Sequence, residues 1–309
     1  MLVTILLNPW ADPDEWFRAF SELLPEEDLV LWPDNPDPSA VEMLIAWRMK
    51  RNDLATFTNL HTIFSMGAGV DQWLREGSPD VRLVRLADPA MANEMAAYAV
   101  HWVAHYQRGF GERFNPAGPE PWGINTAPVA SEYRVGLLGF GEIGRRIGRT
   151  FHDLGYRVRA WTRSGVDDDW VASYRGADGL EKFLGDCDAV INMLPNTEAT
   201  SGLLTADRFS QFVPGATFVN IGRGTVVADE RELVEAVDSG QLGAVVLDVT
   251  NPEPPAPDSP IFTHPRIRVT PHISGMTQRE SAAFLIAANV SRIRAGDEPF
   301  PLVDRQAGY

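Results

Sequence analysis

Short apolar runs alternate with amphipathic stretches along almost the whole chain, and this alternation limits the possible folds more than any other feature. In the first third, the apolar runs are Leu2–Leu7, Asp28–Trp32, Met43–Trp47, Thr62–Met66 and Val81–Leu86. Helical stretches such as Pro13–Leu24 lie between several of them. Because strands that alternate with helices usually pair in parallel through crossover connections, the pattern predicts an α/β fold built on parallel sheets.

The alternation is interrupted once. A long helical stretch, Ala92–Arg108, leads into Gly109–Pro128, which is rich in glycine, proline and asparagine. An irregular segment of this length is unusual inside a compact domain, so we interpret it as an inter-domain or inter-subunit arm. The alternation then resumes with the apolar runs Arg134–Gly139, Tyr156–Trp161, Ala189–Leu194, Ala216–Ile221, Gly243–Val249 and Arg266–Thr270, before a final predicted helix over Gln278–Gly296. The 309 residues are enough for two domains.

Charge and cysteine content exclude several classes of function. The formal net charge of -15 leaves no basic face for phosphates, which argues against a nucleic-acid or membrane partner. The only cysteine, Cys187, cannot form an internal disulfide, which fits a reducing compartment. The apolar segment Met1–Leu7 is too short to span a membrane, so we expect a first strand and a cytoplasmic protein. No cluster with metal-ligand spacing is visible in the sequence.

The strongest local motif is a G-x-G-x-x-G sequence formed by Gly139, Gly141 and Gly144. An apolar strand precedes it, and a helical pattern of Ile143, Ile147, Phe151 and Leu154 follows it. Glycines at this spacing permit a tight turn, close approach of a pyrophosphate, and close packing of helix on strand. The free N–H groups at the start of the helix favour an anion. In this context the motif indicates a dinucleotide-binding turn.

The end of the next strand indicates which dinucleotide is preferred. Enzymes that use NAD usually carry an acidic residue there to bind the adenosine ribose. This chain has Thr162-Arg163-Ser164 instead, a cation between two hydroxyls, which suits the 2′-phosphate of NADPH. We therefore predict that NADPH is favoured over NADH. The alternative is that Arg163 is an ordinary solvated residue and that an acid of the later run Asp167–Asp169 bends back toward the ribose.

Three later strands each end in a polar residue of a different kind. Arg223 follows one strand, Glu253 lies in the loop after the next, and His272 follows the last. Ligands of open parallel sheets bind at the carboxyl ends of the strands, so these side chains are expected to meet there. A histidine can donate a proton to a carbonyl oxygen that receives a hydride, a carboxylate can orient it, and an arginine can bind a substrate carboxylate. The set predicts reduction of a small 2-oxo acid.

Segments over nearly the whole chain resemble the D-2-hydroxyacid dehydrogenase family. Arg223 matches the arginine of its N-x-x-R-G segment, Glu253 the glutamate of its D-V-F-x-x-E-P segment, and His272 the histidine of its T-P-H segment. The chain is also similar to the glyoxylate/hydroxypyruvate reductase A branch, through Phe64–Asp71, Asn192–Thr197 and the tail Val303–Tyr309. Gly165 departs from the pattern, because a further basic residue often stands there and strengthens binding of the 2′-phosphate.

The resemblance implies a flavodoxin-like substrate-binding domain, residues 1–98 plus 276–309, and a Rossmann dinucleotide-binding domain, residues 99–275. Both would be doubly wound parallel-sheet domains, with a cleft between them and hinges near Ala97–Tyr98 and Gly275–Thr277. It implies a homodimer formed through the nucleotide domain, with the 109–128 arm as the exchanged segment.

The resemblance also implies site residues. Those expected to bind substrate are Trp47, Met66, Ala68, Gly69 and Arg223. Those expected to bind the cofactor are Gly139, Phe140, Gly141, Glu142, Ile143, Gly144, Thr162, Arg163, Ser164, Leu194, Pro195, Ile221, Gly222, Arg223, Asp248, His272, Ser274 and Gly275.

Several functions remain open from the sequence. The resemblance implies NADPH-dependent reduction of glyoxylate to glycolate and of hydroxypyruvate to D-glycerate, with His272 as the general acid. The alternatives are a reductase of another 2-oxo acid and a non-catalytic dimer that senses NAD(P) on the same fold. The complete set of Arg223, Glu253 and His272 argues against a pure sensor, because binding alone needs no paired acid. Formate oxidation is disfavoured, because related enzymes pair their histidine with a glutamine in that reaction, whereas this chain has Glu253.

Overall fold

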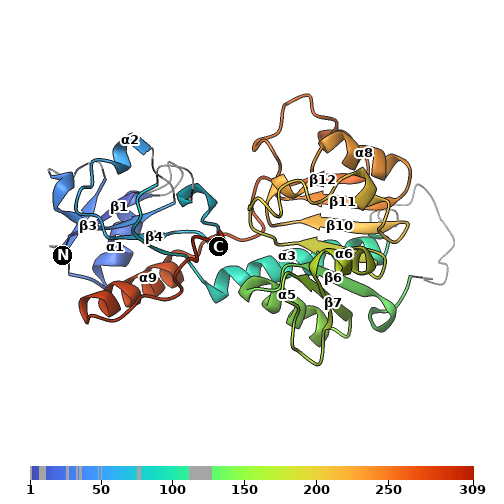
Figure 1. Cartoon of the computed structure of the whole chain (residues 1–309), viewed down its shortest axis with the longest axis horizontal. Coiled ribbons are helices and arrows are strands. Elements are labelled where there is room, and N and C mark those ends of the chain that lie inside the picture. The colour runs from blue at the N-terminus through green and yellow to red at the C-terminus, as the bar shows by residue number, and fades with distance from the viewer. Residues whose placement is uncertain are drawn as a thin grey trace. The chain divides into compact units, whose positions relative to one another are not determined.

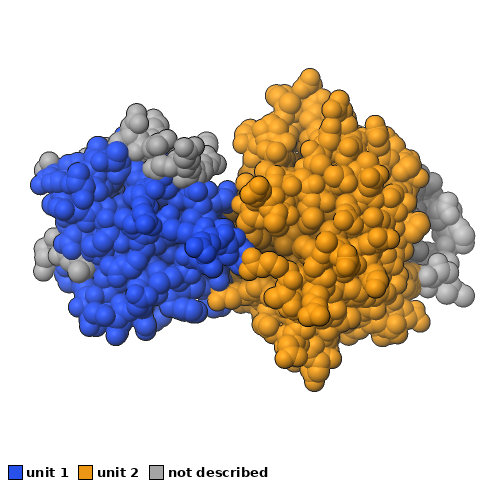
Figure 2. All heavy atoms as spheres, viewed as in Figure 1, with its two compact units in different colours: residues 1–91, 277–309 blue, residues 92–276 orange. Residues whose placement is uncertain are grey.

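The chain divides into two compact units, each with its own core. The first unit comprises Met1–Met91 and Thr277–Tyr309, and the second comprises Ala92–Met276 (Figure 2). The computed structural model describes residues 2–6, 12–25, 28–32, 34, 37–47, 49, 51–74, 78–110 and 127–309. The unit boundary falls earlier than the sequence-based limit at residue 98, because helix α3 (Pro89–Gln107) belongs mostly to the second unit. Most of the 109–128 arm lies outside the described residues.

The first unit is built on a parallel sheet. Within the described residues it has five strands in the order β2-β1-β3-β4-β5, namely β1 (Leu2–Leu6), β2 (Leu29–Leu31), β3 (Val41–Ala46), β4 (Thr62–Ser65) and β5 (Arg82–Val84). The helices are α1 (Pro13–Ser21), α2 (Arg51–Leu54) and α9 (Arg279–Arg294), with short 3₁₀ turns η2 (Pro38–Ala40) and η3 (Asp71–Trp73). α1 and α9 lie side by side (Figure 1). The chain therefore returns to its first unit at its C-terminal end.

The second unit is built on a larger parallel sheet. Its described part has seven strands in the order β12-β11-β10-β9-β6-β7-β8, namely β6 (Arg134–Leu138), β7 (Arg157–Thr162), β8 (Ala172–Arg175), β9 (Ala189–Asn192), β10 (Ala216–Asn220), β11 (Leu242–Leu247) and β12 (Ile267–Val269). The other elements are α5 (Glu142–Asp153), α6 (Gly176–Leu184), α7 (Ala206–Phe209), α8 (Glu230–Asp238), η4 (Ala130–Glu132), η5 (Gly224–Val226) and η6 (Pro260–Phe262). The two parallel sheets confirm the predicted fold class.

Burial explains which strands the sequence revealed. Every residue of β9 and β10 is buried, as expected for parallel strands covered by helices on both faces. β8 was missed, because it is an edge strand with three exposed residues and no apolar run. The helical pattern predicted after the glycine motif also extends one residue beyond α5. The helix ends at Asp153, and Leu154, its C-cap, is 53% exposed, whereas Ile147 and Phe151 are buried.

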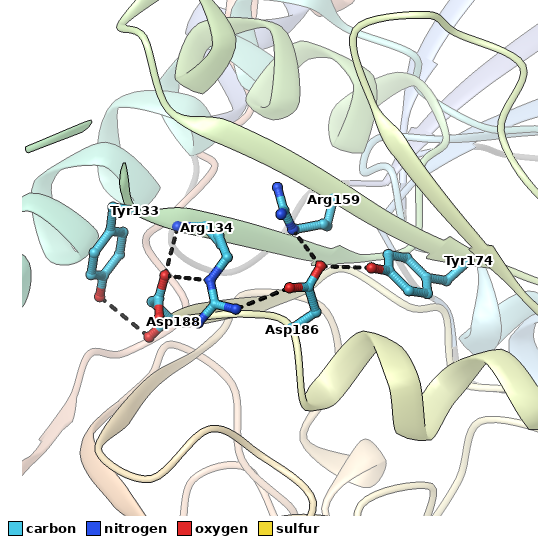
Figure 3. A network of polar contacts seen from close by, with 6 residues as sticks. All are labelled: Tyr133, Arg134, Arg159, Tyr174, Asp186 and Asp188. Carbon is cyan, nitrogen blue, oxygen red and sulfur yellow. Dashed lines mark hydrogen bonds and ion pairs between the residues drawn. The ribbon is translucent and has the colours of Figure 1, made fainter. Parts of the chain in front are cut away.

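A network of hydrogen-bonded polar side chains lies at the amino end of the second sheet (Figure 3). Arg134 donates from Nε to Asp188 Oδ2 at 2.9 Å, from Nη2 to Asp188 Oδ1 at 2.6 Å, and from Nη1 to Asp186 Oδ1 at 2.9 Å. Arg159 Nε and the Tyr174 hydroxyl both donate to Asp186 Oδ2, at 2.8 and 2.6 Å. The network therefore ties β6, β7 and β8 to the turn before β9.

The network also sets the charge states of its members. Burial alone would raise the pKa of Asp186 and of Asp188, but hydrogen bonds from Tyr174 and Arg159 to the first, and from Arg134 to the second, lower both pKa values. The pKa of Tyr174 is raised to about 12, mainly because the hydroxyl is partly buried and also because it donates a hydrogen bond to Asp186. Because the acid pKa values are lowered on folding, the network stabilises the fold above the pKa of the unfolded acids, and this stabilisation is lost as pH falls through the folded values.

No helix among the residues that the structure describes combines the length and apolar character needed to cross a bilayer.

Replacing Asp188 should weaken the second unit measurably. We expect Asp188→Asn to lower the free energy of unfolding by about 1.5–3 kcal/mol, because partly buried hydrogen bonds between charged groups are lost. Chemical denaturation at pH 7 measures the change. The matched control is Asp258→Asn, which changes an exposed acid in a loop of the same unit. Equal stability of the two variants would show that the network contributes little.

Candidate active site

Arg223, Glu253 and His272 lie at the carboxyl edge of the second sheet, after three neighbouring strands. Arg223 follows β10, Glu253 lies in the loop after β11, and His272 follows β12, and these strands are adjacent in the order β12-β11-β10. The β10 and β11 loops touch at Gly224, where an added Cβ would stand only 2.0 Å from the Thr250 carbonyl carbon. Glycine is thus required at this position for the loops to meet.

His272 and Glu253 form a direct pair. Nδ1 of His272 lies 2.6 Å from Oε1 of Glu253, and the two side chains are 51% and 43% exposed. The hydrogen bond to Glu253 is the largest cause of a raised His272 pKa, against which burial acts. Since the carboxylate accepts the Nδ1 proton, Nε2 is the ring nitrogen left to exchange a proton with another molecule. The geometry is that of an oriented acid.

The backbone of His272 is held in an unusual conformation. Its φ of 55° lies in the left-handed region, and among the described residues it is the only non-glycine residue with a positive φ. Its N–H donates to the carbonyl oxygens of Asp248 and Thr270, at 2.9 and 3.0 Å. The Asp248 carboxylate accepts the N–H groups of Ile273 and Ser274, at 2.8 and 2.9 Å. Neighbouring groups therefore impose the strained conformation, as at many functional sites.

A chain of hydroxyl groups connects this loop to helix α3. Thr270 Oγ1 lies 2.6 Å from Asp248 Oδ1 and 2.6 Å from the Tyr98 hydroxyl. An ionised carboxylate can only accept, so Thr270 donates to Asp248 and Tyr98 donates to Thr270. Burial is the largest cause that raises the pKa of Tyr98 to about 12, which keeps this donor protonated. The ring of Trp102 packs edge-to-face against Tyr98, with the ring centroids 6.2 Å apart. The sequence revealed neither Tyr98 nor Thr270, because no motif carries them.

Asp248, one of the residues expected to bind the cofactor, has a structural role in the loop that carries His272. Its side chain is 1% exposed, and Thr270, Ile273 and Ser274 all donate to its carboxylate. These three hydrogen bonds let the carboxylate hold the His272 loop, and its expected contact with the cofactor stays a prediction. Three further residues expected to bind the cofactor have buried side chains that belong to the core of the second unit, namely Phe140, Leu194 and Ile221, at 8%, 8% and 4% exposure.

Two buried asparagines fix the turn that carries Arg223. Asn192 Nδ2 donates to Asn220 Oδ1 at 2.8 Å, and Asn220 Nδ2 donates to the Arg223 carbonyl oxygen at 3.1 Å. The guanidinium donates from Nη1 to the Gly222 carbonyl oxygen at 2.9 Å. Its charge acts on His272, whose pKa it lowers against the effect of Glu253. Arg223 therefore lies within electrostatic reach of the histidine.

The glycine turn after β6 fits a dinucleotide. Gly139 has a φ of +97°, and an added Cβ at Gly144 would stand 2.5 Å from the Gly139 carbonyl oxygen. At Gly141 an added Cβ would meet nothing within 4 Å, so the space beside this backbone is open to a ligand. Gly141 is also the N-cap of α5 and supplies no side chain to accept the first N–H groups of the helix. These are the features that a pyrophosphate requires.

The turn after β7 carries the three residues expected to select the cofactor. The Gly165 N–H donates to Thr162 Oγ1 at 2.8 Å, and Arg163 and Ser164 are exposed. In the acidic run that follows, Asp168 forms an ion pair with Arg145 of α5. This acid is therefore already paired. Of the described residues, no group of three or more His, Cys, Asp or Glu could hold a metal ion.

The residues expected to bind substrate in the first unit differ in their exposure. Trp47 is half-buried and packs edge-to-face on Trp16, with the ring centroids 5.5 Å apart. Its ring lies 3.8 Å from the position of an added Cβ at Gly67. Trp47 is therefore next to the glycine loop that includes Ala68 and Gly69. Met66 is fully buried in the first unit. Its position directly after a buried strand explains why it belongs to the core.

Comparison with known proteins identifies the family. The family model described as "D-isomer specific 2-hydroxyacid dehydrogenase, NAD binding domain" matches residues 123–274. A glyoxylate/hydroxypyruvate reductase A from Serratia proteamaculans is 33% identical over 99% of this chain and 99% of its own length. The chain belongs to the D-isomer specific 2-hydroxyacid dehydrogenase family. The resemblance found in the sequence is thereby confirmed, and the chain is an oxidoreductase of this family.

Solved structures of dehydrogenases in this family extend the likeness to the whole fold. A D-isomer specific 2-hydroxyacid dehydrogenase from Xanthobacter autotrophicus Py2, in complex with NADPH and MES, matches with a TM-score of 0.93 and 31% identity, over 99% of both chains. The NADPH-dependent glyoxylate/hydroxypyruvate reductase from Sinorhizobium meliloti, in complex with NADP and sulfate, matches with a TM-score of 0.91 and 28% identity, over 100% of both chains. The first of these relatives is bound to NADPH and the second to NADP, the cofactors that carry a 2′-phosphate.

Removing the Thr270 hydroxyl should destabilise the His272 loop. Thr270→Val removes one of the three donors to the buried Asp248 carboxylate, so we expect a loss of about 1–3 kcal/mol in the free energy of unfolding. Chemical denaturation is the measurement, and Thr270→Ser, which keeps the hydroxyl, is the matched control. If the two variants lost the same stability, the hydrogen bond to Asp248 would not be what holds the loop.

Proposed function

We propose that the chain catalyses NADPH-dependent reduction of small 2-oxo acids, glyoxylate to glycolate and hydroxypyruvate to D-glycerate. The observation that carries this proposal is the His272–Glu253 pair, with Nδ1 and Oε1 2.6 Å apart, on the same sheet edge as the glycine turn. An oriented histidine beside a dinucleotide site is what carbonyl reduction needs. The first unit, Met1–Met91 plus Thr277–Tyr309, would then form the substrate-binding domain predicted for residues 1–98 plus 276–309, and the second unit would form the dinucleotide-binding domain predicted for residues 99–275.

The residues of the second unit divide the chemistry between them. The bound nicotinamide would supply the hydride that is added to the carbonyl carbon. His272 would donate its Nε2 proton to the carbonyl oxygen, so that the product is a neutral hydroxyl, while Glu253 holds the imidazole through Nδ1. Arg223 would bind the substrate carboxylate through its planar guanidinium. In the reverse direction, neutral His272 would accept the same proton.

The comparisons support the substrates and the cofactor of this proposal. Three curated relatives named glyoxylate/hydroxypyruvate reductase A are 32–33% identical over 99% of the chain. The solved relatives hold NADPH or NADP. The exposed Arg163 beside Thr162 and Ser164 fits a 2′-phosphate. Trp47, Ala68 and Gly69 of the first unit are proposed to contact the substrate.

We also infer a cytoplasmic homodimer formed through the second unit. The single cysteine, which fits a reducing compartment, supports the location. The family resemblance of the chain supports the dimer, and size-exclusion chromatography with light scattering tests it.

The substrate assay tests the proposal directly. We expect oxidation of NADPH, followed by its absorbance, with glyoxylate and hydroxypyruvate, and slower oxidation with pyruvate or with NADH. His272→Ala should lower kcat/KM by roughly 10²–10⁴-fold, because the proton donor is removed. His152→Asn, at the far end of α5 from the glycine turn, is the control and should keep full activity. Turnover restricted to other 2-oxo acids would discard the named substrates, and NADPH binding without turnover would favour the sensor.

The pH profile tests the role of Glu253. Reduction needs protonated His272, so kcat/KM should fall as pH rises through the pKa of this residue. Because the hydrogen bond to Glu253 raises that pKa, Glu253→Gln should move the basic limb of the profile to lower pH. The measurement is kcat/KM against pH for both proteins. An unchanged basic limb would show that Glu253 does not set the protonation of the acid.

A further inference from the structure

A second arginine stands beside the turn that follows β7. β7 and β8 pair in parallel, and their register places Arg175, the last residue of β8, opposite Thr162, the last residue of β7. The carboxyl ends of both strands therefore lie at the same edge of the sheet. The Val166 N–H donates to Ser173 Oγ at 2.7 Å, which fastens the β7 turn to β8. The pairing of β7 with β8 therefore places Arg175 beside the turn, and the Arg175 side chain is not needed to hold the two strands together.

The Arg175 stem lies in contact distance of the position that a side chain at residue 165 would take. An added Cβ at Gly165 would stand 3.6 Å from Arg175 Cδ and 3.8 Å from Arg175 Cβ. Gly165 has a φ of +92°, a conformation that strains any other residue. A basic residue is therefore disfavoured at position 165, where related proteins often carry one. The neighbouring strand brings a guanidinium to the same turn instead.

The Arg175 guanidinium is available for a ligand. The side chain is exposed, and in the described part of the chain it has neither a hydrogen-bond partner nor an ion-pair partner. Two exposed acids, Asp167 and Asp169, stand in the loop between the two arginines, while Asp168 is paired with Arg145. A second cation would offset the repulsion that these acids exert on an incoming phosphate.

We propose that Arg175 binds the 2′-phosphate of NADPH together with Arg163, and so replaces the basic residue missing at position 165. This inference rests on the proposed function, since it concerns the same cofactor. Two guanidinium groups can each donate charge-assisted hydrogen bonds to a phosphate, and the hydroxyls of Thr162 and Ser164 lie in the same turn. NAD has no phosphate at this position, so Arg175 selects the cofactor without taking part in proton or hydride transfer.

Equilibrium binding tests the inference without turnover. Calorimetric titrations of NADP⁺ and NAD⁺ into the full-length protein would compare the wild type with Arg175→Gln, Arg163→Gln and Arg157→Gln. We expect Arg175→Gln to weaken NADP⁺ binding by about tenfold or more, because a hydrogen bond between charged groups is lost. The Kd for NAD⁺ should stay within about twofold, as NAD⁺ lacks the group concerned. Arg157, exposed at the amino end of β7, controls for the loss of a positive charge and should leave both Kd values unchanged.

The two proposals can fail separately in this experiment. If Arg163→Gln abolished the preference for NADP⁺ while Arg175→Gln kept it, Arg175 would have no part in selection and the proposed cofactor would stand. If Arg175→Gln weakened NADP⁺ and NAD⁺ equally, its role would be structural and the inference would be wrong. If the wild type bound both cofactors equally, both the NADPH preference and the inference would be overturned. Titration of 2′,5′-ADP against 5′-AMP gives the same comparison for the adenosine end alone.

Discussion

The buried Asp248 carboxylate is the group on which the arrangement of the candidate site depends. Thr270 and the N–H groups of Ile273 and Ser274 all donate to it, and its own carbonyl oxygen accepts the His272 N–H. These bonds together enforce the positive φ that aims His272 at Glu253. A buried charge without such donors would be costly, so the carboxylate and the loop stabilise each other. The histidine is oriented by the fold as well as by its glutamate.

The two ends of the second sheet have opposite electrostatic organisation. At the amino end, Arg134 and Arg159 neutralise Asp186 and Asp188 through short hydrogen bonds (Figure 3). At the carboxyl end, the turn at Gly141 leaves the first N–H groups of α5 without a side-chain acceptor, and the pair of Glu253 and His272 is about half exposed. One end therefore contributes stability, while the other keeps polar groups available for ligands, as is general for parallel sheets.

The sequence predicted those parts of the site that depend on strand ends and on glycine spacing. Arg223, Glu253 and His272 each follow a strong apolar run, and parallel pairing then brings them to one edge. Asp248 and Met66 lie at or near the ends of such runs, but their burial depends on the packing around them, which a linear pattern does not show. Tyr98 and Thr270 are 172 positions apart, so only the fold reveals their contact. β8 was missed because an exposed edge strand needs no apolar residues.

The position of Arg175 on that edge strand has a consequence for the evolution of this enzyme. The side chain is exposed and packs on the turn rather than in the core, so its replacement removes little buried surface. Asp248 and Ser274, in contrast, are buried, and most substitutions of buried residues are destabilising. With the proposed roles of Arg175 and His272, selection can change the part of the site that binds the 2′-phosphate while leaving the reacting groups intact. In a lineage with this architecture, we expect coenzyme preference to drift faster than reaction chemistry.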